Sequence, residues 1–456
     1  MSPPRPARAR ARRLALIVLV ALAGCAGGRP PADLEGLDRL LARAGASQGP
    51  GDADEADPVP ALLARELTVD AAVRIALLRN RGLSARLAEV GVAGAELITA
   101  LTPENPQLEG VVRLAGGSGA GPSYELTVTQ DLVSLILMPL RARAAEARIE
   151  RARLEVADEV VRLSRDVEAA WYELQGATVT REVLATFSQA ARASYEYAHS
   201  LRVAGNLSQL DLANQEVLLE QARLELARAE AEVLQLRERL ARLMGLWGSE
   251  AEALSLPARL PELPPAEAPL DRLEGTAVER RLDLAALRQE LEALRRERDT
   301  ASTARWLPGL AAGVSGERDG DGEWAIGPAV SLSLPVFDRR QGELARLEAH
   351  TAGARDRLTD LAVAIRAEVR AARARLLATR EIAVHLRDRL VPLRERIVRL
   401  AQEQHDFMLV GTFQLLAAKQ EQLHTYRAYA DSVRDYWLAH NELRRAVGGP
   451  LPAAQE

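Results

Sequence analysis

The sequence predicts a mainly α-helical fold with a small β part, built from one long-helix unit that occurs twice. Two observations lead to this prediction. Apolar residues recur with heptad spacing over 66 residues, 339–404, a length that a compact domain rarely requires. In addition, each half of the chain contains the same series of a helix, two short strands, a long helix and a final helix. A repeat of this size indicates that one architectural unit is used twice.

The heptad stripe of 339–404 predicts one very long helix. Its apolar or small positions alternate in steps of three and four: Ala362, Ile365, Val369, Ala372, Leu376, Thr379, Ala383, Leu386, Leu390, Leu393, Ile397 and Leu400. Such a stripe is typical of a helix that winds in a left-handed coil against its neighbours. At ~1.5 Å per residue the helix would be about 100 Å long. Because a proline inside a helix costs about 3 kcal/mol or kinks it, we expect a bend at Pro392.

The first copy of the unit covers 67–250. Its predicted elements are a helix at 69–101, strands at 107–115 and 124–132, a long helix at 139–201, and a helix that ends near Met244 and Gly245. The segment 251–274, with its Pro-rich core 257–269, is predicted to be a linker.

The second copy covers 275–449 and is followed by a tail, 450–456. Its predicted elements are a helix at 277–305, strands at 309–315 and 324–334, the long helix at 339–404, and a helix that ends at Val447 and Gly448. In both copies the two shorter helices together roughly match the long one in length. We therefore expect them to stack end to end and to run antiparallel to it.

The turns after the two long helices provide a local match between the copies. Val203-Ala204-Gly205-Asn206-Leu207 aligns with Leu409-Val410-Gly411-Thr412-Phe413. Each glycine suits a chain reversal between helices. The other helices carry the same heptad spacing, at Val156, Val160, Leu163, Val167, Ala170 and Leu174, at Leu219, Ala222, Leu226, Ala229, Val233, Leu236, Leu240 and Leu243, and at Leu423, Tyr426, Ala430, Val433 and Trp437.

The predicted strands alternate bulky apolar residues with small or polar ones. Trp324, Ile326 and Val330 fall on one face of their strand, and Ala325, Gly327 and Ala329 fall on the other. This period of two, over about ten residues, suits a strand with lipid outside and water inside, and it equally suits an ordinary half-buried sheet. Four strands are too few to close a barrel in lipid, so several chains would have to contribute, and three chains would give twelve strands.

The N-terminus reads as an export signal. A basic segment is followed by the apolar run 14–22 and then by Leu22-Ala23-Gly24-Cys25, which resembles a bacterial lipobox. Residues 1–24 are thus predicted to be a lipoprotein signal peptide, with Cys25 as the lipidated first residue of the mature chain. Acyl chains on Cys25 would hold it at a membrane. Residues 25–66 are rich in Gly, Pro, Ala and Asp, and are expected to form a mostly irregular tether.

Composition argues against several classes of function. The net charge is −5 with nearly balanced acids and bases, which does not suggest a nucleic-acid surface. The single cysteine excludes an intramolecular disulfide and a multi-cysteine metal site. The six histidines are scattered, and no phosphate loop or catalytic constellation is found. We therefore expect no enzyme activity, no metal site and no cofactor other than the covalent lipid on Cys25.

Taken together, these features resemble the TolC-type outer-membrane efflux family. The resemblance covers about 67–449 and lies in the duplicated unit, the lipobox, and two stretches: Leu67-Thr68-Val69-Asp70-Ala71-Ala72-Val73, and Leu332-Ser333-Leu334-Pro335-Val336-Phe337-Asp338-Arg339-Arg340-Gln341-Gly342-Glu343. The second stretch is similar to the pattern found in this family where a strand passes into the long helix, especially in the lipoprotein branch that serves RND pumps for metal cations.

The resemblance implies a fold, a location and partners. It implies a homotrimer with a twelve-stranded barrel in bacterial outer-membrane lipid and a helical tunnel in the periplasm, working with a periplasmic adaptor (membrane fusion) protein and an inner-membrane RND pump. The adaptor-contact tips would be Val203, Ala204, Gly205, Val410, Gly411 and Thr412. Asp211 matches a gate position of the family, whereas Ala417 and Gln420 stand in the second copy where acids often occur.

The resulting hypothesis is a passive export conduit for metal cations or small organic solutes. Two alternatives stay open at this stage. One is a lipid-anchored periplasmic coiled-coil structural or adaptor protein without a pore, which the repeated strand pairs argue against. The other is a type I secretion conduit, which the lipid anchor makes less favoured because many such conduits lack one.

Overall fold

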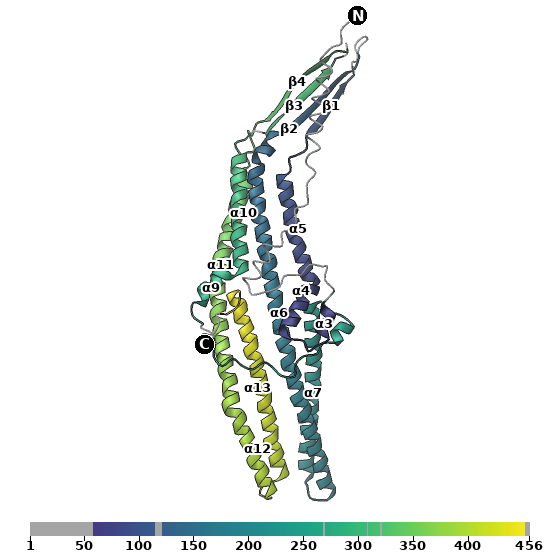
Figure 1. Cartoon of the computed structure of the whole chain (residues 1–456), viewed down its shortest axis with the longest axis vertical. Coiled ribbons are helices and arrows are strands. Elements are labelled where there is room, and N and C mark those ends of the chain that lie inside the picture. The colour runs from purple at the N-terminus through teal and green to yellow at the C-terminus, as the bar shows by residue number, and fades with distance from the viewer. Residues whose placement is uncertain (1–57, 115–120, 268–269, 308, 320–321, 452–456) are drawn as a thin grey trace. The chain divides into compact units, whose positions relative to one another are not determined.

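The structure is a computed structural model that describes residues 58–114, 121–267, 270–307, 309–319 and 322–451. The predicted signal peptide, Cys25 and most of the predicted tether lie outside these residues. The described chain divides into two compact units. One unit comprises residues 90–149 and 296–345 and contains the sheet; the other comprises residues 58–89, 150–295 and 346–451 and is helical (Figure 1).

The sheet has four antiparallel strands in the order β1-β2-β3-β4: β1 (Gln107–Arg113), β2 (Ser123–Asp131), β3 (Gly309–Arg318) and β4 (Trp324–Ser333). Each copy of the repeat contributes one hairpin, and β2 pairs with β3 across the copies. The strands were predicted at the correct places. β3 extends three residues beyond its predicted end, into the predicted loop, because Gly316, Glu317 and Arg318 all pair with β4.

The sheet has one apolar and one polar face, as the alternation predicted. In register, Leu108 lies opposite Val128, and Val128 lies opposite Val314, and all three side chains are exposed. On the other face the hydroxyl of Thr127 donates to the hydroxyl of Ser315 at 2.9 Å. Arg113, on the same polar face, forms ion pairs with Glu125 and Glu317. The apolar face therefore lies exposed while the polar face is cross-linked by its own side chains.

Helix α6 (Leu132–Val203) begins seven residues earlier than predicted. The prediction started at Pro139, but Asp131 at the end of β2 caps the helix by accepting a hydrogen bond from the backbone nitrogen of Ser134 at 2.9 Å. Because of this cap the strand passes directly into the helix, and Pro139 lies inside it.

The short helices of each copy are broken where one continuous helix was predicted. In the first copy α4 (Val69–Arg79) and α5 (Arg81–Leu101) are separated by Asn80, whose ψ of 110° is extended. The side-chain amide of Asn80 donates to the carbonyl of Leu243, and its oxygen accepts from the nitrogen of Leu83. In the second copy α9 (Leu273–Arg280) and α10 (Leu282–Ala304) are separated in the same way by Arg281.

Each break lies against the end of the last helix of its own copy. α7 (Gln209–Met244) ends at Gly245, and a Cβ there would come within 2.5 Å of the carbonyl oxygen of Arg79. α13 (Thr412–Val447) ends at Gly448, which abuts Arg281 in the same manner. Both glycines are left-handed, with φ of 71° and 77°. The predicted end-to-end arrangement of the two shorter helices is thereby confirmed within this unit.

The long helix of the second copy is interrupted near Pro392. α11 (Gln341–His385) is followed by a π-helical turn, η1 (Leu386–Leu390), and then by α12 (Val391–Asp406), which runs beside α13 to a common turn (Figure 1). In a regular α-helix the ring of a proline clashes with the carbonyl group of the residue four positions earlier. A π-helical turn is wider than an α-helical one and relieves this clash. The irregularity expected at Pro392 takes the form of this π-helical turn.

The heptad stripes form the core of the helical unit. The positions from Val156 to Leu174 on α6 are buried, as are Ile365, Val369 and Leu376 on α11. Beyond η1 the same stripe is exposed, at Leu393, Ile397 and Leu400. None of the helices in the described part of the chain has the apolar run that a membrane crossing needs.

The segments on either side of the first copy pack on it. α3 (Val59–Leu63) lies in the last part of the predicted irregular tether, and the buried Leu67 donates from its nitrogen to the carbonyl of Ser255 at 2.7 Å. The short helix α8 (Ser249–Glu252) opens the linker. Further along, Gln175 of α6 donates to the carbonyls of Pro257 and Arg259, so this part of the linker is fixed on α6.

Candidate functional site: the helical tips

The first tip joins α6 to α7 through a left-handed glycine. Gly205 has a φ of 77°, and its nitrogen donates to the carbonyl of Arg202 at 3.0 Å. The nitrogen of Asn206 donates to the carbonyl of Leu201 at 2.9 Å. These bonds satisfy carbonyls that the end of a helix leaves open. Val203 is 77% exposed, and a Cβ on Gly205 would meet nothing within 4 Å.

The second tip joins α12 to α13 by the same turn, with methionine in the left-handed position. Met408 has a φ of 58°, and its nitrogen donates to the carbonyl of His405 at 2.8 Å. The nitrogen of Leu409 donates to the carbonyl of Gln404, also at 2.8 Å. Gly411, in contrast, has an extended backbone with φ of −77° and ψ of 158°, and it caps the N-terminus of α13. Gly411 therefore lies in the chain reversal, as predicted, but it is not the residue that adopts the left-handed conformation.

The structure aligns the two tips differently from the sequence match, which had paired Gly205 with Gly411. The correct alignment is shifted by three residues. Gly205 corresponds to Met408, and Ser208, the N-cap of α7, corresponds to Gly411, the N-cap of α13. The same offset of 203 relates Gly245 to Gly448 at the far ends of these helices. A sequence match between glycines fails here because the exposed Met408 tolerates a left-handed conformation, at a cost of about 1–2 kcal/mol.

Asp211 stands three residues after Ser208, the N-cap of α7, and the two residues bond to each other. Its backbone nitrogen donates to the hydroxyl of Ser208 at 3.0 Å, and the hydroxyl of Ser208 donates to its carboxylate at 2.6 Å. In the corrected register its counterpart is Gln414, whose side-chain oxygen accepts from the nitrogen of Gly411 at 3.2 Å. Both side chains stabilise helix starts. The gate role of Asp211 stays a prediction.

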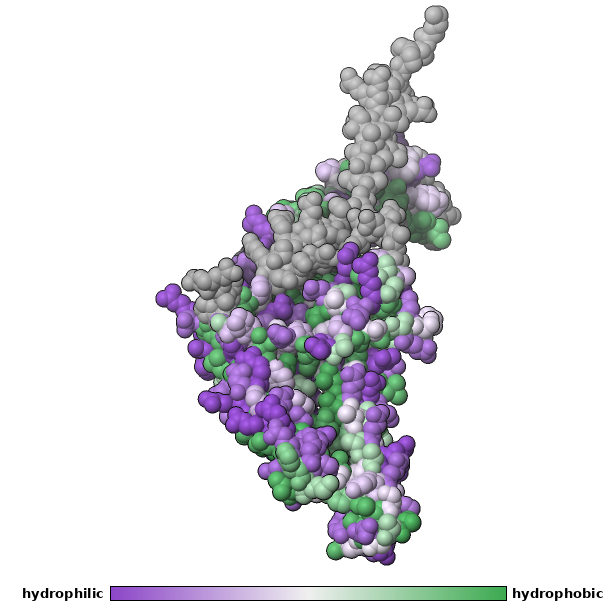
Figure 2. Space-filling view, turned by 60° about the horizontal axis from the view of Figure 1, so that its bottom comes forward, coloured by the Kyte–Doolittle hydropathy of each residue, from purple (hydrophilic) through white to green (hydrophobic). Residues whose placement is uncertain are grey.

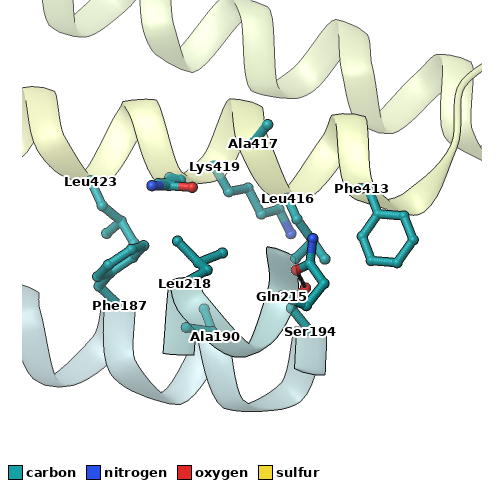
Figure 3. Close-up of a pocket in the computed structure, with 12 residues that line it drawn as sticks. Phe187, Ala190, Ser194, Gln215, Leu218, Phe413, Leu416, Ala417, Lys419 and Leu423 are labelled. Atoms are coloured by element: carbon teal, nitrogen blue, oxygen red, sulfur yellow. Dashed lines mark hydrogen bonds between the residues drawn. The ribbon is translucent and has the colours of Figure 1, made fainter. Parts of the chain in front are cut away.

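A small pocket of about 110 Å³ lies between the helices near the two tips (Figure 3). Phe187 and Ser194 of α6, Leu218 of α7 and Leu416 of α13 line it, and the hydroxyl of Ser194 donates to Gln215 at 2.7 Å. Ala417 and Gln420 also line it, together with the chain's single lysine, Lys419. Of these two positions, at which the family often has acids, Ala417 is exposed and Gln420 is half-buried.

The most exposed apolar group at the tips was missed by the sequence reasoning. Phe407, Met408 and Leu409 are 78%, 92% and 74% exposed, whereas Val410 and Thr412 of the predicted tip are half-buried. Hydrophobic patches interrupt the hydrophilic surface of the helical unit (Figure 2). The available signal was a run of three large apolar residues that does not continue the heptad stripe. An exposed run of this kind suits contact with another protein.

A buried polar cluster joins the first and second copies away from the tips. Arg165 of α6 is 4% exposed and donates to both carboxylate oxygens of Glu168, at 2.7 and 2.8 Å. Arg444 of α13 donates to the same carboxylate at 3.2 Å, and the amide of Asn441 donates to the carbonyl of Arg165. Burial, and then the charges of Arg444 and Arg165, lower the pKa of His440 to about 4. These groups fix how α13 packs on α6.

The fold is that of the TolC-type outer-membrane channels, which confirms the predicted resemblance. No family model matches the chain. It is similar to the cobalt-zinc-cadmium resistance protein CzcC of Cupriavidus metallidurans, with 27% identity over 296 residues, which are 62% of this chain and 67% of the relative.

Two solved structures illustrate the likeness of fold. CusC aligns with a TM-score of 0.69 at 18% identity, covering 84% of this chain and 93% of CusC. The outer-membrane channel CmeC of Campylobacter jejuni aligns with a TM-score of 0.68 at 16% identity, covering 85% of this chain and 87% of CmeC.

Proposed function

We propose that this chain is the outer-membrane channel component of a tripartite efflux system. The observation that carries the proposal is the four-stranded sheet, which has an exposed apolar face, a polar face linked by its own side chains, and two edges, β1 and β4. In lipid, open edges are not tolerated because their backbone groups find no partner. Three copies joined edge to edge would close a barrel of twelve strands with the apolar face toward lipid.

The helical unit supports the same assembly. The stripe Leu393, Ile397 and Leu400 on α12 lies exposed in the single chain, although its spacing is that of a helix-packing seam. In a homotrimer this stripe would pack on helices of neighbouring copies and form a periplasmic tunnel. The exposed tips would then meet a periplasmic adaptor protein, and an inner-membrane RND pump would supply the energy. The chain itself acts as a passive conduit without catalysis.

Divalent metal cations are the substrates that we favour. The supporting observation is the similarity to a cobalt-zinc-cadmium resistance protein over 62% of the chain. We further propose that Cys25 carries lipid and anchors the mature chain in the outer membrane. Cys25→Ser should abolish labelling by a radioactive fatty acid and leave the signal peptide uncleaved. Normal labelling of the variant would contradict this assignment.

The test of the channel is the detergent-corrected mass of the full-length protein, together with its conductance in planar lipid bilayers. We expect a trimer that forms discrete, long-lived conductance steps. A monomer or dimer without conductance would contradict the proposal and favour a lipid-anchored coiled-coil adaptor. If cells that express the protein secrete an unfolded polypeptide and their zinc tolerance does not change, a type I secretion conduit would be favoured.

A further inference from the structure

A polar cavity of about 620 Å³ lies at the end of the sheet that adjoins the helices. The paired residues Gly309 of β3 and Ser333 of β4 line it, as does Asp131, at the end of β2. The start of α6, the end of α10, Glu104 and the segment 334–340 after β4 also line it. All of these residues belong to the sheet-containing unit.

Four arginines and three carboxylates line this cavity, and most of these charges are already engaged. Arg141 forms an ion pair with Glu104 at 3.5 Å, and Arg340 pairs with Glu343, outside the lining, at 3.1 Å. The carboxylates of Asp131 and Asp338 accept hydrogen bonds from the backbone nitrogens of Ser134 and Arg340.

The other two arginines, Arg305 and Arg339, have no carboxylate partner within the described residues. The guanidinium of Arg305 lies 4.9 Å from the ring centroid of Trp306, and its Nε is buried without a hydrogen-bond partner. Arg339 donates from Nε to the carbonyl of Pro335 at 3.3 Å. Two guanidinium groups therefore line one polar cavity with unused donors.

Large apolar side chains line the same cavity as these arginines or, in the case of Trp306, lie against Arg305. Phe337 is 92% exposed, and Leu334, Val336 and Trp306 are exposed as well. Leu334, Val336 and Phe337 follow the end of β4 and line the cavity. Unpaired guanidinium groups beside exposed apolar side chains match a ligand that is anionic at one end and apolar at the other.

We propose that this cavity binds the phosphate of a glycerophospholipid, with Arg305 and Arg339 on the phosphate and Phe337 and Leu334 against the acyl chains. The inference rests on the proposed function, because it requires the apolar face of the sheet to lie in a bilayer. The arginines then stand at the level of the lipid headgroups, on the helix side of the sheet. Guanidinium groups suit this role because they bind phosphate oxygens through two parallel hydrogen bonds.

The test is a titration of the delipidated full-length protein in detergent with phosphatidylglycerol, in which bound lipids are counted by native mass spectrometry. The double variant Arg305→Gln/Arg339→Gln should bind at least about tenfold more weakly than the wild type. The matched control Arg143→Gln/Arg298→Gln removes the same charge from the same unit outside the cavity lining and should stay within about twofold. Arg305→Lys/Arg339→Lys keeps the charge and should bind with intermediate strength, which guards against a folding defect.

Three results would overturn the inference. The first is equal lipid binding by the wild type and the double Gln variant. The second is equally tight binding of diacylglycerol, which would make the phosphate irrelevant. The third is displacement of the lipid by inorganic phosphate at equal concentration, which would indicate a site for free phosphate. Conductance separates this inference from the proposed channel: a conducting wild type with arginine-independent lipid binding refutes only the lipid site, whereas a non-conducting wild type refutes the channel.

Discussion

Gly313 lies on the polar face of β3, opposite Thr129 of β2. A Cβ at this position would lie 2.7 Å from the carbonyl carbon of Val128 and 2.8 Å from the Cα of Thr129, and nearer still to the carbonyl oxygen of Val128. Real Cβ atoms essentially never come within 3.0 Å of a heavy atom outside their own residue and its two chain neighbours. Gly313→Ala must therefore push β3 away from β2. Overpacking costs about 1–3 kcal/mol and each weakened backbone hydrogen bond about 1 kcal/mol, so we expect a loss of about 3 kcal/mol.

Gly327 provides the matched control. It lies on the same face of the neighbouring strand β4, opposite Ser315, and a Cβ there would meet nothing within 4 Å. Gly327→Ala should leave stability within about 0.5 kcal/mol or raise it slightly. The assay is denaturant unfolding of both full-length variants in detergent micelles, followed by tryptophan fluorescence. Equal midpoints for Gly313→Ala and Gly327→Ala would refute the reasoning, since backbone crowding is the property in which the two sites differ.

Three further predictions concern the helical unit. In thermal unfolding, Gly245→Ala should lower the free energy of unfolding by about 3 kcal/mol, because backbone strain and a clash with the backbone of Arg79 add. Gly205→Ala lies in open space and should lower it by about 1 kcal/mol, from backbone strain alone. Equal losses would contradict the packing at Gly245. Met408→Gly should slow hydrogen exchange of the tip amides by removing about 1 kcal/mol of strain, and unchanged exchange would argue against a left-handed Met408. Because the pKa of His440 is lowered to about 4, its contribution is complete above pH 6.5 and is lost as the pH falls toward 4. The free energies of unfolding of the wild type and of His440→Gln should therefore diverge by about 3 kcal/mol across that pH range. Parallel curves of this free energy against pH would contradict the lowered pKa.

Much of the fold could be predicted because its elements are long and strongly periodic. The stripe from Ala362 to Ala383 has heptad spacing, and the structure buries it or half-buries it throughout. The strand alternation was equally informative, because neighbouring side chains on a strand point to opposite faces. The breaks at Asn80 and Arg281 were not predicted, since each depends on contacts with the last helix of its copy.

The places of the two helix reversals were predicted correctly, whereas the backbone conformation of the second was not. Both tips lie at helix reversals, as expected, and the exposed residues of the first tip include Val203 and Gly205. In the second tip the glycine signal pointed to Gly411, although Met408 occupies the left-handed position and the exposed apolar run begins at Phe407. Backbone conformation at an exposed turn is set by hydrogen bonds to preceding carbonyls, and residue type gives only a preference for it.

The sequence by itself determined the repeat, the helix and strand order, and the two faces of the sheet, because these follow from the periods of single elements. Tertiary structure decided the rest. It joined β2 to β3 across the two copies, placed Gly245 and Gly448 against the helix breaks, and exposed the stripe on α12 beyond Pro392. It also placed Arg305 and Arg339 around the same cavity as the start of α6, which is distant from both arginines in the sequence. The physical reason is that contacts between elements depend on which surfaces remain uncovered once the helices have packed, and no local period specifies this.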